Sequence, residues 1–351
     1  MFNKYLYISI IAILCMIYTS CQKEKNIVIN KSTIEFDKFH LEDSLFFTTI
    51  EAKDVDSVLY NPKKILYHKN HLFVQDFKSG EGKHIKLFSL NDCKTIASFA
   101  NYGNGPEELL ACDMCILNNN LWLYDLSQNT IHYVNIDSIL NNKFKLCKYN
   151  LNNGNYYSFA MLNDSILLGT NNINSDNKIS YENILTSSVV RKGIYDYYNE
   201  NISLPALNDA ARCYIKCNPK TNEIALLYRY TDLLEIYMPN GDFKCSSYGP
   251  ERSDIMIHPT AERANKTKET KKAFVNTYVT SQYIYALYSG AKKGEENWAN
   301  GTQLFVYSWN GEPIKKYHLS QPIYTFSVDE DKKILYSYSL NEDTFITAKL
   351  D

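Results

Sequence analysis

The sequence predicts an all-β fold in which six four-stranded antiparallel sheets form a closed ring. Three observations support this fold: an aromatic share of 14%, a strand motif that recurs six times, and Asn-Gly or Asn-Gly-Asp turns between strand-like runs. Tyrosine and phenylalanine favour β-strands, and Asn-Gly is typical of the tight turn in a β-hairpin. A ring of such sheets is a six-bladed β-propeller.

The recurring motif is a short apolar and aromatic run, often preceded by Asn or Asp. The six copies are Asn70–Asp76, Asn119–Asp125, Asp164–Thr170, Asn222–Tyr228, Ser281–Tyr288 and Lys332–Tyr338. Their central residues lie 49, 45, 58, 60 and 50 positions apart. Each copy has another apolar run before it, and several have a third strand and a hairpin turn after it, as at Pro239–Asp242 and Asn310–Pro313. Four antiparallel strands per repeat make one propeller blade, so six blades fill residues 60–351.

Ring closure should involve the N-terminal segment. The last predicted strand, Thr344–Leu350, leaves its blade one strand short, and an unclosed ring would expose pairing edges. Two earlier runs, Asn26–Phe36 and Ser44–Ile50, are strand-like, and we expect one of them to complete the blade. Residues 21–59 are therefore predicted to be a closing segment within a single domain, 21–351. A β-sandwich is the alternative, but it does not require a strand motif to recur six times.

The first 20 residues are predicted to be a lipoprotein signal peptide. Lys4 precedes an apolar run, Leu6–Tyr18, that is too short to span a bilayer comfortably. Small residues then precede Cys21, which resembles a bacterial lipobox, and the resemblance implies cleavage before Cys21 and lipidation of its thiol. Cleavage would remove one lysine and change the net charge from −2 to about −3. A plain signal peptide with an incidental cysteine is the alternative.

Seven cysteines follow Cys21 in the sequence, and an odd number cannot all be paired in disulfides. Cys112 and Cys115 have CxxC spacing, and Cys213 and Cys217 are four apart, so together they could hold zinc. Both pairs border or lie in strand-like runs, however, where a four-residue spacing separates two thiols by roughly 13 Å. Buried free thiols are therefore favoured over a zinc site or a Cys112–Cys115 disulfide.

Two glycine–proline stretches are predicted to be turns between blades. They are Tyr102–Leu109 ("YGNGPEEL") and Tyr248–Arg252 ("YGPER"), and their prolines are 144 residues apart, close to three blades. Glycine allows φ values that other residues avoid, and proline prevents further strand pairing. A phosphate-binding loop is not favoured, because no GK[ST] follows and two carboxylates would repel phosphate. The residues assigned to these turns are Gly103, Gly105, Pro106, Gly249 and Pro250.

Together with the lipoprotein signal and the six blades, this motif resembles the TolB-like six-bladed β-propeller lipoproteins of Bacteroidetes. These are related in shape to NHL-type propellers, whose repeats often carry G-x-G-P-x-x-[FL], matched here by Gly103, Gly105, Pro106 and Leu109. The resemblance covers nearly the whole mature chain by architecture, but its specific motif is short. It implies the fold and the cellular location: a protein held by a lipid anchor in the outer membrane of a Gram-negative envelope, on its periplasmic or surface face. It implies no particular activity.

Neither charge nor motifs single out a reaction. A net charge of −2 gives no sign of the concentrated basic face that nucleic-acid binding needs. No G-x-S-x-G occurs, and we assign no catalytic residue. Propeller enzymes hold a metal in the central channel, and the expected inner strands end near His68, Asn118, Asn163, Asn218, Asn276 and Asp329. This rim has few carboxylates, so it supports calcium only weakly, and asparagine is also a common turn residue. A metal-dependent hydrolase or lyase is the alternative function.

Two insertions in the second half of the chain carry the candidate binding residues. Thr260–Lys272 is basic and compatible with a helix beginning near Pro259. Ser289–Gln303 places Trp298, an aromatic residue of the kind that binding surfaces use, in a polar loop. The candidate ligand-binding residues are Arg263, Lys266 and Trp298. A solvated helical excursion is the alternative. We expect a monomeric, non-catalytic binding or scaffolding module for a protein or small-molecule ligand.

Overall fold

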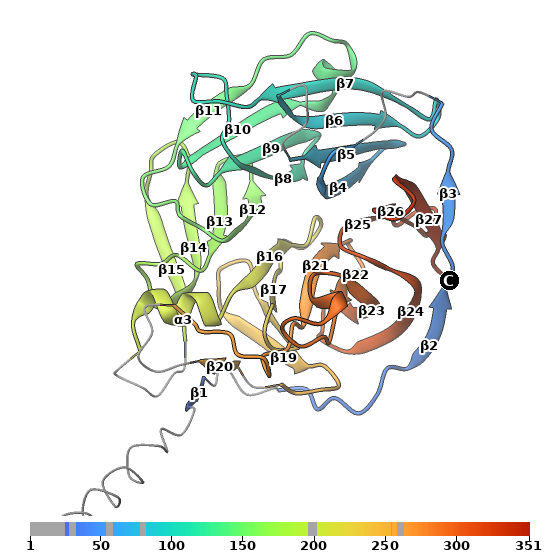
Figure 1. Ribbon diagram of the computed structural model, residues 1–351. Coiled ribbons are helices and arrows are strands. Elements are labelled where there is room, and N and C mark those ends of the chain that lie inside the picture. The colour runs from blue at the N-terminus through green and yellow to red at the C-terminus, as the bar shows by residue number, and fades with distance from the viewer. Residues whose placement is uncertain are drawn as a thin grey trace, which may run out of the picture.

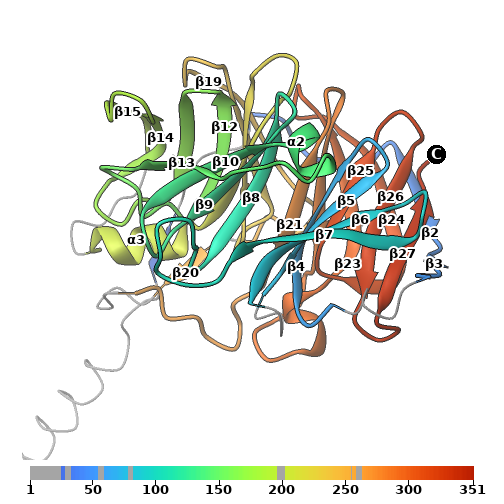
Figure 2. The ribbon, with the colours of Figure 1, turned by 90° about the horizontal axis from the view of Figure 1, so that it is seen from above.

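The computed structural model describes residues 25–27, 33–53, 59–77, 82–195, 202–253, 255–257 and 263–351. Six sheets surround a central axis in Figure 1, and Figure 2 shows the ring after a quarter turn. The predicted signal peptide and Cys21 lie outside the described residues. Among the helices that are described, none has the length and apolar character needed to cross a membrane.

In the first four blades, each blade is an antiparallel sheet whose four strands follow one another along the chain. Blade 1 contains β4 (Pro62–His68), β5 (His71–Asp76), β6 (Lys83–Ser89) and β7 (Lys94–Asn101). Blade 2 contains β8 (Cys112–Leu117), β9 (Asn120–Asp125), β10 (Thr130–Asn135) and β11 (Cys147–Asn150). Blade 3 contains β12 (Ser158–Asn163), β13 (Ile166–Thr170), β14 (Asn177–Asn183) and β15 (Val189–Ile194).

The second half of the ring repeats this pattern with additions at its outer edge. Blade 4 contains β16 (Cys213–Cys217), β17 (Ile224–Tyr228), β18 (Leu233–Tyr237) and β19 (Phe243–Tyr248). Blade 5 contains β21 (Phe274–Val279), β22 (Tyr283–Tyr288), β23 (Gly301–Ser308) and β24 (Pro313–Ile323), joined by β2 (Leu41–Leu45). Blade 6 contains β25 (Phe326–Asp329), β26 (Ile334–Ser339), β27 (Thr344–Lys349) and β3 (Thr48–Ile50). Each copy of the predicted motif forms the second strand of a blade.

The N-terminal segment closes the ring, as the sequence predicts. The strand β3 pairs antiparallel with β27, with Ile50 opposite Phe345 and Thr48 opposite Thr347. Just before it, β2 pairs in parallel with the outer strand β24 of blade 5. Chain segments from the two ends thus share one sheet, so the last blade does not present an unpaired β27 edge.

The hydrophobic core is divided among the interfaces between neighbouring blades. In β9, Leu121 and Leu123 pack toward blade 1, whereas Trp122 and Tyr124 pack toward blade 3. Successive side chains of a strand point to opposite faces, so both faces of this strand are buried. This explains why the second strand of each blade is an almost continuous apolar run in the sequence.

Outside the blades the structure contains short elements. These are β1 (Lys25–Ile27), which pairs with β20 (Ile255–Ile257), the helices α2 (Ile136–Leu140) and α3 (Leu204–Ala210), and the 3-10 helix η2 (Glu296–Ala299). The helix expected at Thr260–Lys272 is wrong for its described part, residues 263–272, which form turns and extended chain. Backbone hydrogen bonds join this part to the Ser289–Gln303 loop, including Lys272 N to Ala291 O at 2.8 Å and Gly290 N to Lys272 O at 2.8 Å.

The cysteines within the described part of the chain are all free thiols. Cys112 and Cys213 are buried, whereas Cys147 on the outer strand β11 is exposed. Burial raises the pKa of the Cys213 thiol to about 12, which keeps it protonated near neutral pH.

Candidate functional site

The central channel is lined by the first strand of several blades and contains two cavities. One cavity of about 250 Å³ lies at the C-terminal ends of β4, β8, β16 and β21. A second, of about 280 Å³, lies nearer the N-terminal ends of the same strands. Lys216 of β16 lines both cavities.

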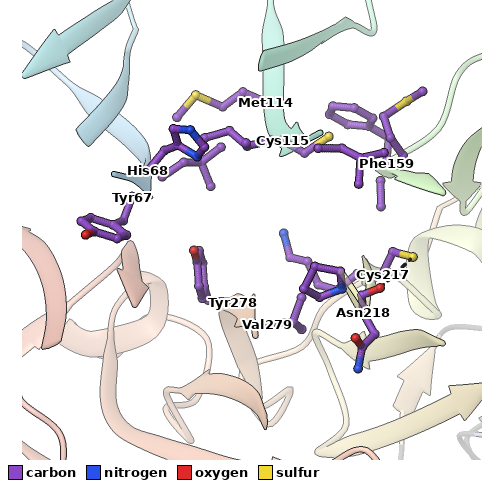
Figure 3. A pocket seen from close by; sticks show the side chains of 16 residues that line it. Tyr67, His68, Met114, Cys115, Phe159, Cys217, Asn218, Tyr278 and Val279 are labelled. Atoms are coloured by element: carbon purple, nitrogen blue, oxygen red, sulfur yellow. Dashed lines mark hydrogen bonds between the residues drawn. The ribbon is translucent and has the colours of Figure 1, made fainter. Parts of the chain in front are cut away.

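The first cavity has a mainly apolar wall. Figure 3 shows Met114, Phe159 and Val279 among the side chains that surround its opening. His68 is the histidine in this wall, and its Nε2–H donates to Oδ1 of Asn119 at 3.0 Å. Burial lowers the pKa of His68, so its neutral form is favoured near pH 7. The cavity therefore suits an uncharged, largely apolar group.

The second cavity is more polar. Lys64 Nζ and Asp113 Oδ1 form an ion pair at 2.6 Å in its wall, and Asn276 Nδ2 donates to Tyr324 O at 3.1 Å. Tyr157 and Tyr214 complete the side that faces blades 3 and 4. Asp113 is the carboxylate among the residues that line these two cavities.

Two of the asparagines expected at the strand ends, Asn163 and Asn218, bond to the turns that follow, whereas Asn276 lies within β21. Oδ1 of Asn163 accepts hydrogen bonds from the backbone of Ser165 and Ile166 at 2.9 Å. Oδ1 of Asn218 likewise accepts from Lys220 N at 2.8 Å. Across the described ranges, no three His, Cys, Asp or Glu side chains are grouped so that they could hold a metal ion.

The stretch Tyr102–Leu109 connects β7 of blade 1 to β8 of blade 2. Oε2 of Glu108 accepts a hydrogen bond from Gly105 N at 2.8 Å, and Gly103 N donates to Leu109 O at 3.1 Å. A Cβ on Gly103 would lie 2.0 Å from Oε2 of Glu108, so any other residue here would displace that carboxylate from its place in the turn. Pro106, which lies between Gly105 and Glu108, is exposed. Glu108 is thus occupied within the turn itself.

The second stretch, Tyr248–Arg252, leads away from β19 of blade 4. Here the buried carboxylate of Asp232 accepts from the backbone of Glu251 at 2.7 Å and of Arg252 at 3.1 Å. A Cβ on Gly249 would lie 2.8 Å from Oδ2 of Asp232, and Pro250 is exposed. Both stretches therefore wrap their backbone around a carboxylate, supplied from within the turn in one case and from the loop before β18 in the other.

A cluster of cations and aromatic rings lies on the face of the ring where the chain enters β16 and β21. We call it the cationic cluster; it contains Arg212, Arg229, Lys266, Lys272, Tyr157, Tyr214, Tyr230 and Trp298. The guanidinium carbon of Arg212 lies 5.1 Å from the ring centre of Tyr157, and that of Arg229 lies 5.4 Å from the same ring. Such contacts between cations and aromatic faces are attractive.

One carboxylate, that of Asp209, forms ion pairs with this cluster. Its Oδ1 lies 2.9 Å from Arg212 and its Oδ2 lies 3.1 Å from Lys266. Among the described residues, Asp209 is thus the carboxylate that forms ion pairs with this cluster, and it pairs with two of the four cations. An excess of positive charge at a concave surface attracts negatively charged molecules.

Lys272 is the most enclosed cation of the cluster. Its side chain is 4% exposed, and Nζ lies 4.6 Å from the ring centre of Tyr230 and 4.8 Å from that of Trp298. Within the described residues no carboxylate forms an ion pair with it. Burial, followed by the charges of Arg229, Lys266 and Arg212, lowers the pKa of Lys272 to about 7. A negative charge beside Lys272 would offset these effects.

The three residues selected from the sequence lie around this cluster. Arg263 and Lys266 line a cavity of about 920 Å³ together with Tyr157, Asp209 and Arg212. Trp298 is not among the residues of that cavity, but it stacks on Tyr230, whose ring also contacts Lys266 at 5.0 Å. The two insertions that carry these residues therefore share a face of the ring. Lys292 and Glu269 join them in an ion pair at 2.5 Å.

Sequence reasoning missed Arg212, Arg229, Tyr157, Tyr214 and Tyr230. They lie at strand ends in three separate segments that meet only in the folded ring. A local signal does exist: Arg212 directly precedes β16, whose second residue is Tyr214, and Arg229 and Tyr230 directly follow β17. Basic and aromatic residues next to each other at the end of a core strand are unusual, because a strand buried on both faces is otherwise apolar.

Comparison with known proteins agrees with the architecture. A family model described as a TolB-like 6-blade propeller matches residues 40–331. The chain belongs to this family. The resemblance expected from the "YGNGPEEL" motif, six blades and lipoprotein signal is thereby confirmed for the fold and family. Among curated proteins, no sequence matches the chain significantly.

Two solved structures from Bacteroides show the same fold. A member of the DUF4221 family from Bacteroides vulgatus is 11% identical with a TM-score of 0.60, over 88% of this chain and 98% of that one. A putative exported protein from Bacteroides fragilis is 12% identical with a TM-score of 0.55, over 89% of this chain and 99% of that one. At these identities, the likeness of this TolB-like propeller to both structures concerns the fold alone.

Proposed function

We propose that this TolB-like propeller is an envelope binding protein that holds an acidic ligand on the cationic cluster. The ligand carries carboxylate, sulfate or phosphate groups that lie near Lys272, Lys266 and Arg212. The proposal is supported above all by Lys272, a lysine that is 4% exposed, is enclosed by aromatic rings and other cations, and has no carboxylate partner in the described part of the chain.

The neighbouring cavity is large enough for such a ligand. Small-molecule sites in proteins commonly occupy 300–1,000 Å³, and the cavity beside Arg212 and Lys266 measures about 920 Å³. Asp209 already orients Arg212 and Lys266 through ion pairs, which limits the ordering that binding would require. The aromatic rings leave the cations less hydrated than they would be at an open surface. A bound anion therefore gains more from these charges than from scattered surface lysines.

The test uses citrate, which carries three carboxylates, in low-salt buffer at pH 7. Calorimetric titration of the wild type should show saturable binding that weakens as salt is added, because salt screens charge attraction. Lys272→Met should weaken citrate binding at least about tenfold, equivalent to about 1.4 kcal/mol. Arg263→Gln, at an exposed position of the cavity wall, should have a smaller effect.

Lys94→Met is the matched control, since it removes one exposed positive charge from β7 on a different blade. It should leave citrate affinity within about twofold of the wild type. An equal loss in Lys94→Met and Lys272→Met would mean that citrate responds only to net charge. That result, or an absence of saturable binding by citrate, sulfate and inorganic phosphate alike, would contradict the proposal.

The proposed attachment to the envelope is through a lipid on Cys21. It is supported by the lipobox-like residues before Cys21 and by the fold shared with a putative exported protein. Expression of the full chain with a radiolabelled fatty acid should give a labelled protein in the membrane fraction. Cys21→Ala should lose the label, and continued labelling of that variant would exclude Cys21 as the anchor.

A further inference from the structure

Lys216 is a cation inside the channel that the acidic-ligand proposal does not use. It lies on β16 opposite Ala225 of β17, and its side chain lines both channel cavities. No described residue forms an ion pair with it, in contrast to Lys64, which is held by Asp113 at 2.6 Å. A lysine in the wall of a channel, without a carboxylate of its own, is available to a ligand that enters.

The surroundings of Lys216 disfavour its charged form. Leu66, Met114 and Phe159 contribute to the apolar wall of the first cavity. Burial, followed by the positive charge of Lys64, lowers the pKa of Lys216 to about 7, against a smaller opposing effect of Asp113. A substantial share of the ε-amine is therefore uncharged at neutral pH. An uncharged amine has a free electron pair and is a nucleophile.

We propose that Lys216 captures carbonyl compounds: its ε-amine condenses with a small apolar aldehyde in the channel to form an imine. The amine nitrogen bonds to the carbonyl carbon and gives a carbinolamine. The carbon–oxygen bond then breaks, and the oxygen leaves as water with the two hydrogens of the amine. The step consumes one amine and one aldehyde and releases one water, so it requires neither an oxidant nor a cofactor.

The same cavity contains two thiols that do not compete for the aldehyde. Burial raises the pKa of Cys115 and of Cys217 to about 12, so both remain protonated near pH 7. A protonated thiol is a weak nucleophile, because the thiolate is the reactive form. The first cavity, at about 250 Å³ with a mainly apolar wall, accommodates a small aldehyde better than a charged acid. This inference uses channel residues only and stands whether or not citrate binds the cationic cluster.

The experiment uses benzaldehyde as the probe and sodium cyanoborohydride, which reduces the imine to a stable secondary amine. The folded full chain is treated at pH 7, and the modified lysines are identified by peptide mass mapping. Lys216 should carry the benzyl group in preference to Lys63, an exposed lysine that lines the second cavity, by at least about tenfold. The same treatment in urea gives the distribution expected without the folded channel.

The pH profile distinguishes a reactive amine from one that is merely accessible. The titratable groups that line the two cavities around Lys216 are Lys63, Lys64, Tyr67, His68, Cys112, Asp113, Cys115, Tyr157, Tyr214, Cys217, Tyr278 and Tyr324. Modification of Lys216 should reach half of its maximal rate near pH 7. Exposed lysines should accelerate only toward their ordinary pKa of about 10.4.

Two variants and a competitor complete the test. Lys216→Arg keeps the positive charge but removes the nucleophile, so the preferred adduct should vanish, whereas Lys63→Arg should retain it. Modification spread over exposed lysines with Lys216 untouched in the folded protein would overturn the proposal. Binding of benzoate at Lys216 without formation of any benzaldehyde adduct would also overturn it, since that result describes an anion site. If Lys216→Arg does not fold, the modified lysines of the wild type, mapped in buffer and in urea, still show whether the folded channel directs the reaction to Lys216.

Discussion

Two buried lysines of this propeller have nearly the same exposure but opposite surroundings. Lys178 of β14 is 2% exposed, and its Nζ lies 2.8 Å from Oε1 of Glu235. Glu235 also accepts hydrogen bonds from the hydroxyls of Tyr228 at 2.7 Å and Tyr237 at 2.9 Å. Lys272 is 4% exposed and has aromatic faces and other cations around it instead.

The difference separates a charge that serves folding from one that is available for binding. The Lys178–Glu235 pair lies in the interface between blades 3 and 4, where each charge satisfies the other. Lys272 does not line the cavity itself but shares the ring of Tyr230 with Lys266, which does, and no described carboxylate forms an ion pair with it. A protein that retains such a lysine loses stability, which is typical of functional sites.

Replacement of each lysine by methionine should separate the two roles most clearly. Lys178→Met leaves the Glu235 carboxylate buried without its cation, which should lower the free energy of unfolding by about 3–5 kcal/mol. Lys272→Met removes an uncompensated charge, so the free energy of unfolding should stay unchanged or rise by on the order of 1 kcal/mol. Urea denaturation at pH 7, followed by tryptophan fluorescence, measures both.

Glu235→Gln combined with Lys178→Met provides the control, because the double variant no longer contains an isolated buried carboxylate. It should recover part of the stability that Lys178→Met loses. A comparable loss of stability in Lys272→Met would show that Lys272 is also a structural residue. The acidic-ligand proposal would then lose its main support.

The arrangement of the blades could be predicted because it depends on a local and repeated pattern. A strand buried on both faces must be apolar at every position, and Leu72, Phe73 and Val74 of β5 meet this requirement within three residues. Ring closure followed from a physical requirement, the pairing of the last edge, which β3 meets. Neither inference needed knowledge of distant contacts.

The cationic cluster could not be predicted in the same way, since its residues come from different blades and loops. Arg212 precedes β16, Arg229 follows β17, and Trp298 belongs to the η2 segment. Tertiary pairing also overrode the helix expected after Pro259. Thr270 O accepts from Lys293 N at 3.0 Å, so a backbone group that a helix would use is bonded to a separate loop. Insertions without a repeat pattern carry little information about such partners.

A smaller effect, the pH dependence of stability, sharpens the comparison further. The pKa of Lys272 is lowered from 10.5 to about 7 in the folded protein. Between these values the unfolded chain holds a proton on Lys272 that the folded chain has released. Because the unfolded state then binds more protons, the free energy of unfolding of the wild type should rise with pH relative to Lys272→Met. The free energy of unfolding of Lys272→Met minus that of the wild type should be most positive below pH 7 and should fall as the pH rises toward 10.5.

Urea denaturation of both proteins at intervals from pH 6 to pH 10.5 measures this difference, and groups that titrate in both chains cancel in the comparison. Lys94→Met shows how much of the trend comes from net charge alone. The charges of Arg229, Lys266, Arg212 and Asp209 around Lys272 are the same in both chains, so the trend reports the one amine. A difference that stays constant over this pH range would mean that Lys272 keeps its proton in the folded state. In that case a nearby anion already stabilises the ammonium, and citrate should compete with it.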